Sequence, residues 1–94
     1  MSEKRIENQI KKYLDSIDAW HIKTHGNMFS KAGTPDILAC IKGYFVAIEV
    51  KRPGGVVSKL QEINIDLINQ TGGIAFVAYS VTEVERYLQR HNLV

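Results

Sequence analysis

The chain has 94 residues, 45% of them hydrophobic and 23% charged, which is the balance of one globular domain. Its formal net charge at pH 7 is only +2, so bulk charge does not predict a polyanionic partner. A single cysteine, Cys40, excludes an internal disulfide and a zinc site built from several thiolates. No apolar run approaches membrane length, and the N-terminus lacks the core of a signal peptide. We therefore expect a reducing, cytoplasmic setting, with Cys40 as a small buried hydrophobe.

Residues 2–19 predict an amphipathic helix that Ser2 can cap. Its apolar face is made of residues at helical spacing: Ile6, Ile10, Tyr13, Leu14 and Ile17. Glu7 lies about 100° from Ile6, at the edge of this face, so it would border whatever the helix packs on. A solvent-exposed carboxylate is the alternative interpretation of Glu7, and Glu3, one turn earlier on the same side, is a second candidate acid.

Residues 20–23 predict a short strand, and residues 27–35 predict a loop. His21 and His25 have the spacing of a zinc-binding pair on a helix, but the neighbouring Trp and Ile favour a strand, so we expect no zinc there. Lys31 and His25 are candidates for phosphate contacts, and loop solubility is the alternative for each.

Residues 36–50 form two apolar runs interrupted once, at Lys42-Gly43, which predicts a β-hairpin with a two-residue turn. A two-residue turn fixes the register, so Ile41 would face Tyr44 and all other pairs would follow. Lys-Gly is a weaker turn than Asn-Gly, because the first position of a type I′ turn needs a positive φ. A longer loop with a shifted register therefore stays open as an alternative.

Counting back from the turn places Asp36 opposite Glu49, with Lys51 on the same face of the sheet. Opposed carboxylates destabilise a sheet, and such oxygen ligands favour Mg²⁺ or Mn²⁺, so the pair predicts a divalent cation site. The second strand is apolar on both faces until Glu49, which is typical of a central strand covered by helices. A buried acid needs a partner, and a salt bridge with Lys51 is the structural alternative.

Ser58 and Gln61 predict a capping box at the start of a second helix, which Gly72-Gly73 would end. The apolar residues of this helix are expected to face inward: Leu60, Ile63, Leu67 and Ile68. Gln61 lies at the edge of that stripe, so it could border a site as well as cap the helix.

Residues 74–79 are apolar throughout and predict an interior strand. Ser80 and Glu83 predict a second capping box, which opens a last helix ending near Arg90 with Val81, Val84 and Leu88 inward. The element order is α-β-β-β-α-β-α. Crossover helices between strands imply an α/β fold with a mixed sheet flanked by helices.

An Asp followed by Glu-x-Lys on the next strand, in a chain of this order, resembles the core of the PD-(D/E)XK nuclease superfamily. More narrowly, it is similar to stand-alone VRR-NUC domains, the virus-type replication-repair nucleases. The matching pieces are Glu7, Gly33-Thr34-Pro35-Asp36, Glu49-Val50-Lys51, and Ser58 with Gln61. The resemblance covers essentially the whole chain, so it implies a single nuclease domain over residues 1–94 with a restriction-endonuclease-like core.

The resemblance implies a metal-dependent, structure-selective endonuclease that hydrolyses phosphodiester bonds in branched DNA such as four-way (Holliday) junctions. Asp36, Glu49 and the carbonyl of Val50 would bind Mg²⁺ or Mn²⁺, and Glu7 would act through water or at a second metal. Lys51 would orient or deprotonate the attacking water, or stabilise charge on the phosphorane. Gln61 would position the water or a neighbouring ligand. The implied setting is the cytoplasm of a bacterial or phage-infected cell.

Basic residues cluster in sequence around the acids and are candidates for phosphate contacts: Lys23, His25, Lys31, Arg52 and Lys59. The chain has one Glu-x-Lys motif, so symmetric cleavage of a junction would need a homodimer. The candidate dimer surfaces are Trp20, Phe29, and the last helix with Tyr87 and Leu93. The alternatives are a non-catalytic DNA-binding module with a nuclease fold, a purely structural domain, and a restriction-type enzyme, for which the chain is short.

Overall fold

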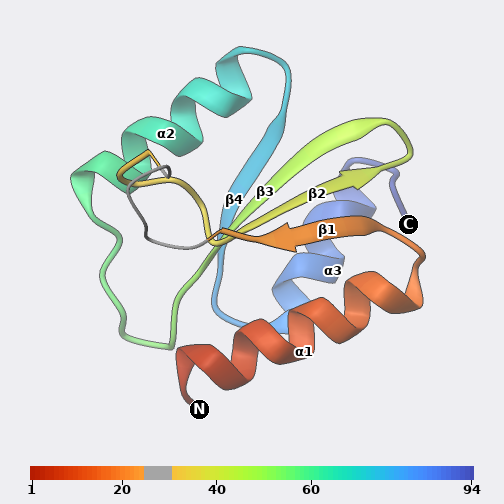
Figure 1. Ribbon diagram of the computed structural model, residues 1–94, viewed down its shortest axis with the longest axis horizontal. Coiled ribbons are helices and arrows are strands. Elements are labelled where there is room, and N and C mark those ends of the chain that lie inside the picture. Colours follow the sequence, from red (N-terminus) through yellow and green to blue (C-terminus); the bar gives the residue numbers. More distant parts are fainter. Residues whose placement is uncertain (25–30) are drawn as a thin grey trace.

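The computed structural model describes residues 1–24 and 31–94 (Figure 1). Its elements are α1 (Glu3–Ser16), β1 (Trp20–Lys23), β2 (Ile37–Ile41), β3 (Tyr44–Val50), α2 (Lys59–Gln70), β4 (Ile74–Ala78) and α3 (Val81–Arg90). The four strands form one sheet in the order β1-β2-β3-β4. The first three strands are antiparallel neighbours, and β4 is parallel to β3. The predicted α/β class, element order and mixed sheet are confirmed.

The core lies between one face of the sheet and the two helices α1 and α3. Alternate residues of β2, β3 and β4 point into it, as the period of two requires. The helices add Ile6, Ile10 and Leu14 from α1, and Val84 and Leu88 from α3. Helix α2 lies on the other face, mainly over β4 and β3 (Figure 1). The acid-bearing strand β3 is therefore central and has helices on both sides.

The hairpin between β2 and β3 has the predicted two-residue turn. Lys42 and Gly43 have φ values of 51° and 84°, so both lie in the left-handed region that a type I′ turn requires. Ile41 pairs with Tyr44, and the pairing continues in step to the far end of β2. The predicted register is confirmed, and the longer loop is excluded. Asp36 is the residue immediately before β2, so it lies next to the last pair of this register.

Three expectations about burial are wrong. Strand β4 lies at the edge of the sheet, not in its interior, and stays buried because α2 and α3 contact it from opposite sides. Cys40 is exposed, because it lies on the face that α2 covers only in part. Helix α2 has no buried residue, and the side chains expected to face inward are about half exposed: Leu60, Ile63 and Leu67.

The last helix does not offer the apolar surface expected of it. Tyr87 stacks on Phe76 with the ring centroids 4.2 Å apart, and Leu93 is buried in the core. Phe29, another candidate for a dimer surface, lies outside the described residues. Within the described ranges, no helix is both long enough and apolar enough to cross a membrane.

Candidate active site

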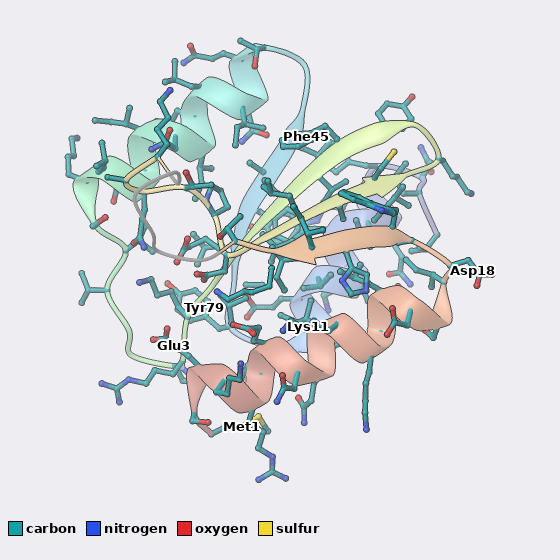
Figure 2. The ribbon with its side chains drawn as sticks, viewed as in Figure 1. Met1, Glu3, Lys11, Asp18, Phe45 and Tyr79 are labelled. Atoms are coloured by element: carbon teal, nitrogen blue, oxygen red, sulfur yellow. The ribbon has the colours of Figure 1, made fainter. Side chains whose placement is uncertain are left out.

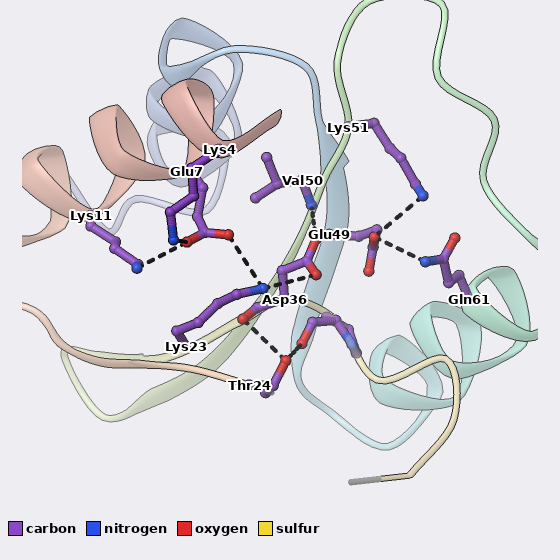
Figure 3. A network of polar contacts seen from close by, with 11 residues as sticks. Lys4, Glu7, Lys11, Lys23, Thr24, Asp36, Glu49, Val50, Lys51 and Gln61 are labelled. Carbon is purple, nitrogen blue, oxygen red and sulfur yellow. Dashed lines mark hydrogen bonds and ion pairs between the residues drawn. The ribbon is translucent and has the colours of Figure 1, made fainter. Parts of the chain in front are cut away.

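The predicted acids meet at the end of the sheet opposite the hairpin turn (Figure 3). Asp36 immediately precedes β2, and Glu49 lies near the end of β3. Helix α1 brings Glu7 to this end, and the first turn of α2 brings Gln61. Lys51 follows β3 directly. The structure thus brings together residues that lie up to 54 positions apart in the chain.

Asp36 is held by both of its carboxylate oxygens. Oδ2 accepts a hydrogen bond of 2.9 Å from the backbone N–H of Val50, and Oδ1 lies 3.2 Å from Nζ of Lys23. The backbone of Thr24 donates to the carbonyl of Asp36 at 2.8 Å, and its hydroxyl donates to the carbonyl of Pro35. These contacts fix the carboxylate at the junction of three strands.

A close approach to α2 positions the segment that carries Asp36. Gly33 has a φ of 80°, and a Cβ added there would lie 2.8 Å from Cγ of Leu60 and 2.9 Å from its backbone carbonyl carbon. Next to it, the side-chain amide of Asn64 donates to the carbonyl of Ala32 at 3.2 Å. Only glycine combines this backbone conformation with this contact, so the motif that begins at Gly33 depends on it.

Glu49 is a buried carboxylate with incomplete pairing. Its residue is 2% exposed, and Oε2 accepts from Nε2 of Gln61 at 3.1 Å and lies 3.7 Å from Nζ of Lys51. Oε1 is buried and has no hydrogen-bond partner among the described residues. Burial and the charge of Asp36 raise the pKa of Glu49 to about 8, although Lys51 and Lys23 oppose this shift. The site therefore disfavours the charged form of Glu49 unless a cation is added.

Gln61 has both of the roles that its position allows. Its Oε1 accepts from the backbone N–H of Ser58 at 2.8 Å, and Ser58 Oγ accepts from the backbone N–H of Gln61, which completes the predicted capping box. Because Oε1 is used by the helix, Nε2 is the end of the amide that faces Glu49. The helix cap therefore sets the orientation of a side chain in the site.

Glu7, not Glu3, faces the site. Glu3 is exposed at the start of α1 (Figure 2), whereas Glu7 is only 6% exposed, so the solvent-exposed interpretation of Glu7 is wrong. Oε1 of Glu7 lies 3.3 Å from Nζ of Lys23, and Oε2 lies 2.9 Å from Nζ of Lys11 and 3.5 Å from that of Lys4. Burial alone would raise the pKa of Glu7, but the ion pairs with Lys11 and Lys23 outweigh it and lower the pKa.

Lys23, a candidate for a phosphate contact, lies inside the carboxylate cluster. Its ammonium contacts both Glu7 and Asp36. Partial burial lowers the pKa of Lys23, but its interactions with Asp36 and Glu7 outweigh this and raise it. Sequence reasoning missed this role because it depends on the pairing of β1 with β2, where Lys23 faces Ile37, the neighbour of Asp36. It also missed Thr24 and Lys11.

The remaining predicted basic residues surround the site less closely. Lys31, Arg52 and Lys59 are exposed. His25 lies outside the described residues. His21 lies in β1, a strand, and its Nε2 is 2.7 Å from Oδ1 of Asp15.

The donor set suits a divalent cation on the Glu49 side of the cluster. Two carboxylates converge there, and Oε1 of Glu49 has no hydrogen bond and no ion pair among the described residues. Within residues 1–24 and 31–94, no three His, Cys, Asp or Glu side chains lie close enough together to hold a metal ion alone. Glu7, the third acid, is separated from Asp36 by the ammonium of Lys23. Backbone carbonyls, water or substrate oxygens would complete a coordination sphere.

A mixed sheet flanked by helices, with two acids and a lysine at the end of its central hairpin, is the architecture of a nuclease-type α/β domain. The sequence profile of the VRR-NUC domain matches residues 2–82. A solved structure described as a VRR_NUC domain protein superposes with a TM-score of 0.73 at 17% identity, covering 95% of this chain and 89% of that one. No curated protein sequence matches the chain. The chain belongs to the VRR-NUC family, and is thus a nuclease-family, DNA-processing domain.

Proposed function

We propose that this domain is a metal-dependent, structure-selective DNA endonuclease that acts on branched DNA such as four-way (Holliday) junctions, in the cytoplasm of a bacterial or phage-infected cell. One observation carries the catalytic part of the proposal: among the described residues, Oε1 of the buried Glu49 has neither a hydrogen bond nor an ion pair. Oε2 of Glu7 also lacks a hydrogen bond, but it lies 2.9 Å from the ammonium of Lys11. A buried carboxylate oxygen with no donor and no cation is costly, so a bound cation is the partner that Glu49 calls for.

Asp36, Glu49 and the backbone carbonyl of Val50 would hold Mg²⁺ or Mn²⁺, with Glu7 acting through water or at a second metal. When bound, such a cation supplies a water of lowered pKa and neutralises charge on the phosphate. Lys51 orients or deprotonates the attacking water, or stabilises charge on the phosphorane. Gln61 keeps the carboxylate of Glu49 in place through its amide. The ammonium of Lys23 lies between the carboxylates of Asp36 and Glu7 and forms an ion pair with each.

The exposed basic residues Lys31, Arg52 and Lys59 would contact the phosphates of the DNA, together with His25, which lies outside the described residues. Such contacts position a duplex without reading its sequence.

The active species in this proposal is a homodimer, because one chain has one Glu-x-Lys motif and symmetric cleavage of a junction needs two centres. Among the candidate surface residues that the structure describes, Trp20 is the one that is exposed, at 62%. Trp20 pairs with Cys40, which in turn pairs with Phe45. These three exposed residues form a row across β1, β2 and β3, on the face of the sheet that α2 covers only in part (Figure 2 shows Phe45).

The proposal is tested by cleavage assays on four-way, flapped and linear DNAs with Mg²⁺, Mn²⁺ or EDTA. We expect paired cuts in the four-way junction that require divalent metal. Glu49→Gln and Lys51→Ala should lower the rate by about 100- to 1000-fold, the usual loss when a group that stabilises transition-state charge is removed. Lys12→Ala, which removes an exposed lysine from α1, is the matched control and should cleave normally. Junction binding without cleavage in every metal would instead identify a non-catalytic DNA-binding module.

A further inference from the structure

The ammonium of Lys23 lies between two carboxylates that come from different parts of the chain. It is 3.3 Å from Oε1 of Glu7 in α1 and 3.2 Å from Oδ1 of Asp36 before β2 (Figure 3). The three side chains are 25%, 8% and 28% exposed, so the contact is shielded from bulk water. A positive charge that joins two carboxylate oxygens is the arrangement that a bridging metal ion would otherwise create.

Positive charge is distributed unevenly over the cluster. On one side, Glu7 contacts Lys11 at 2.9 Å and shares Lys23 with Asp36. On the other side, the ion pair of Glu49 among the described residues is with Lys51, 3.7 Å from Oε2, and Oε1 has neither an ion pair nor a hydrogen bond there. A divalent cation is therefore attracted to the Glu49 side and repelled by the ammonium on the Glu7 side.

We propose that Lys23 is a built-in cation that fills the Glu7–Asp36 side of the site, so that each chain binds one divalent metal ion, on the Glu49 side. This inference rests on the proposed function, because it takes a divalent cation as the cofactor. It rules out the second of the two roles proposed for Glu7, at a second metal: Glu7 is a positioning residue that holds Lys23 and is not itself a metal ligand in the wild-type protein. It also explains why the acid of α1 is separated from Asp36 by an ammonium.

The test is a calorimetric titration of the metal-free protein with Mn²⁺, without DNA. We expect one Mn²⁺ per chain for the wild type and two for Lys23→Met, because Glu7 and Asp36 then lack their shared ammonium. Lys12→Met removes the same charge from an exposed position of α1 and should still bind one ion. The double variant Lys23→Met/Glu7→Gln should return to one ion, because the second site needs the Glu7 carboxylate.

Thermal melting provides a second readout that does not depend on activity. In EDTA, Lys23→Met should melt at a lower temperature than the wild type, because it leaves two acids without their cation, and Mn²⁺ should raise its melting temperature more than that of the wild type. If Lys23→Met does not fold in EDTA, Lys23→Gln, which keeps hydrogen-bond donors, replaces it. If the wild type and the Lys23 variants each bind one ion, or if the wild type binds two, this inference is wrong but the proposed function still stands. No Mn²⁺ binding by the wild type overturns the proposed function with it.

Discussion

Glu49 is the residue whose ionisation is most sensitive to what occupies the site. Folding buries it and places Asp36 beside it, and both effects favour the protonated form. In the unfolded chain its pKa returns to the ordinary value of 4.5, whereas in the folded protein it is about 8. Between these two values the folded state holds a proton that the unfolded chain has released, so this proton stabilises the metal-free fold.

The sign of this linkage predicts how stability depends on pH. The contribution of Glu49 is fully present below pH 4.5 and is lost as the pH rises through about 8, so the metal-free protein should become less stable from pH 5 to pH 9. Glu49→Gln cannot ionise, so it should remove this slope and raise the stability at pH 9 by a few kcal/mol, on the order of 1.4 kcal/mol per pKa unit. Melting temperatures in EDTA across this range would show the effect. An equal slope in both proteins would contradict the assignment of the raised pKa to Glu49.

Removal of the Asp36 carboxylate need not stabilise the metal-free fold as removal of Glu49 should, although the two acids repel each other as a pair. Asp36 accepts from the backbone N–H of Val50 and contacts Lys23, so its removal leaves a backbone donor and an ammonium without their partner. Removing Asp36 relieves its repulsion of Glu49 but leaves donors unsatisfied, so the net change in stability cannot be predicted from the sequence pattern. The register of Asp36 could be predicted from sequence, but its hydrogen bonds could not.

At the scale of elements, the sequence predicted those features that depend on residues close together in the chain. The N-caps Ser2, Ser58 and Ser80 and the turn at Lys42-Gly43 depend on residues within a few positions of each other, and all were predicted correctly. The full capping box predicted for the last helix is wrong, because Glu83 accepts from the backbone N–H of Tyr79 instead of that of Ser80. The edge position of β4 and the role of Lys23 depend on which strand lies beside which, and apolar runs do not encode that order. The half-exposed face of α2 has the same origin, because the helix extends over only part of the sheet.

The contact between the loop before β2 and helix α2 can be tested with one pair of glycine variants. Gly33 and Gly54 have φ values of 80° and 84°, so replacement by alanine strains both to a similar extent, by about 1–2 kcal/mol. An alanine Cβ at Gly54 meets nothing within 4 Å, whereas at Gly33 it meets the backbone of Leu60 at 2.9 Å. Gly33→Ala should therefore lose about 1–3 kcal/mol more stability than Gly54→Ala, as overpacking does.

Because the clash would also displace Asp36, Gly33→Ala should cleave DNA at least tenfold more slowly than Gly54→Ala under conditions where both are folded. Chemical denaturation and cleavage assays on the two variants measure the two effects separately. Equal losses in both variants would show that the approach of the loop to α2 does not position the acid.

For the whole molecule, the exposed row of Trp20, Cys40 and Phe45 predicts the surface of the proposed dimer. Light scattering at micromolar concentration should give twice the 10.6 kDa chain mass for the wild type. Trp20→Lys places a charge in the middle of an apolar contact and should give the mass of one chain. Val56→Lys, at an even more exposed apolar residue in the loop before α2, is the control and should leave the mass unchanged.

A monomeric wild type, both alone and on junction DNA, with isolated nicks as the only product, would contradict the dimer. A dimer that persists in Trp20→Lys would leave two-fold cleavage intact but would place its interface elsewhere. The two outcomes separate the proposal of paired centres from the choice of surface.

The hairpin turn has an evolutionary consequence, because it determines which residues face each other at the opposite end of the strands. Lys42 and Gly43 lie five residue pairs, or about 17 Å, from the acids, in the kind of surface loop where insertions usually do least harm. Here one added residue would shift every later pair by one position and turn Glu49 to the other face of the sheet, away from Asp36. Natural variation should therefore accumulate in the loop of residues 53–57, while the turn keeps its length. An active relative with a three-residue turn and the same acid spacing would refute this constraint.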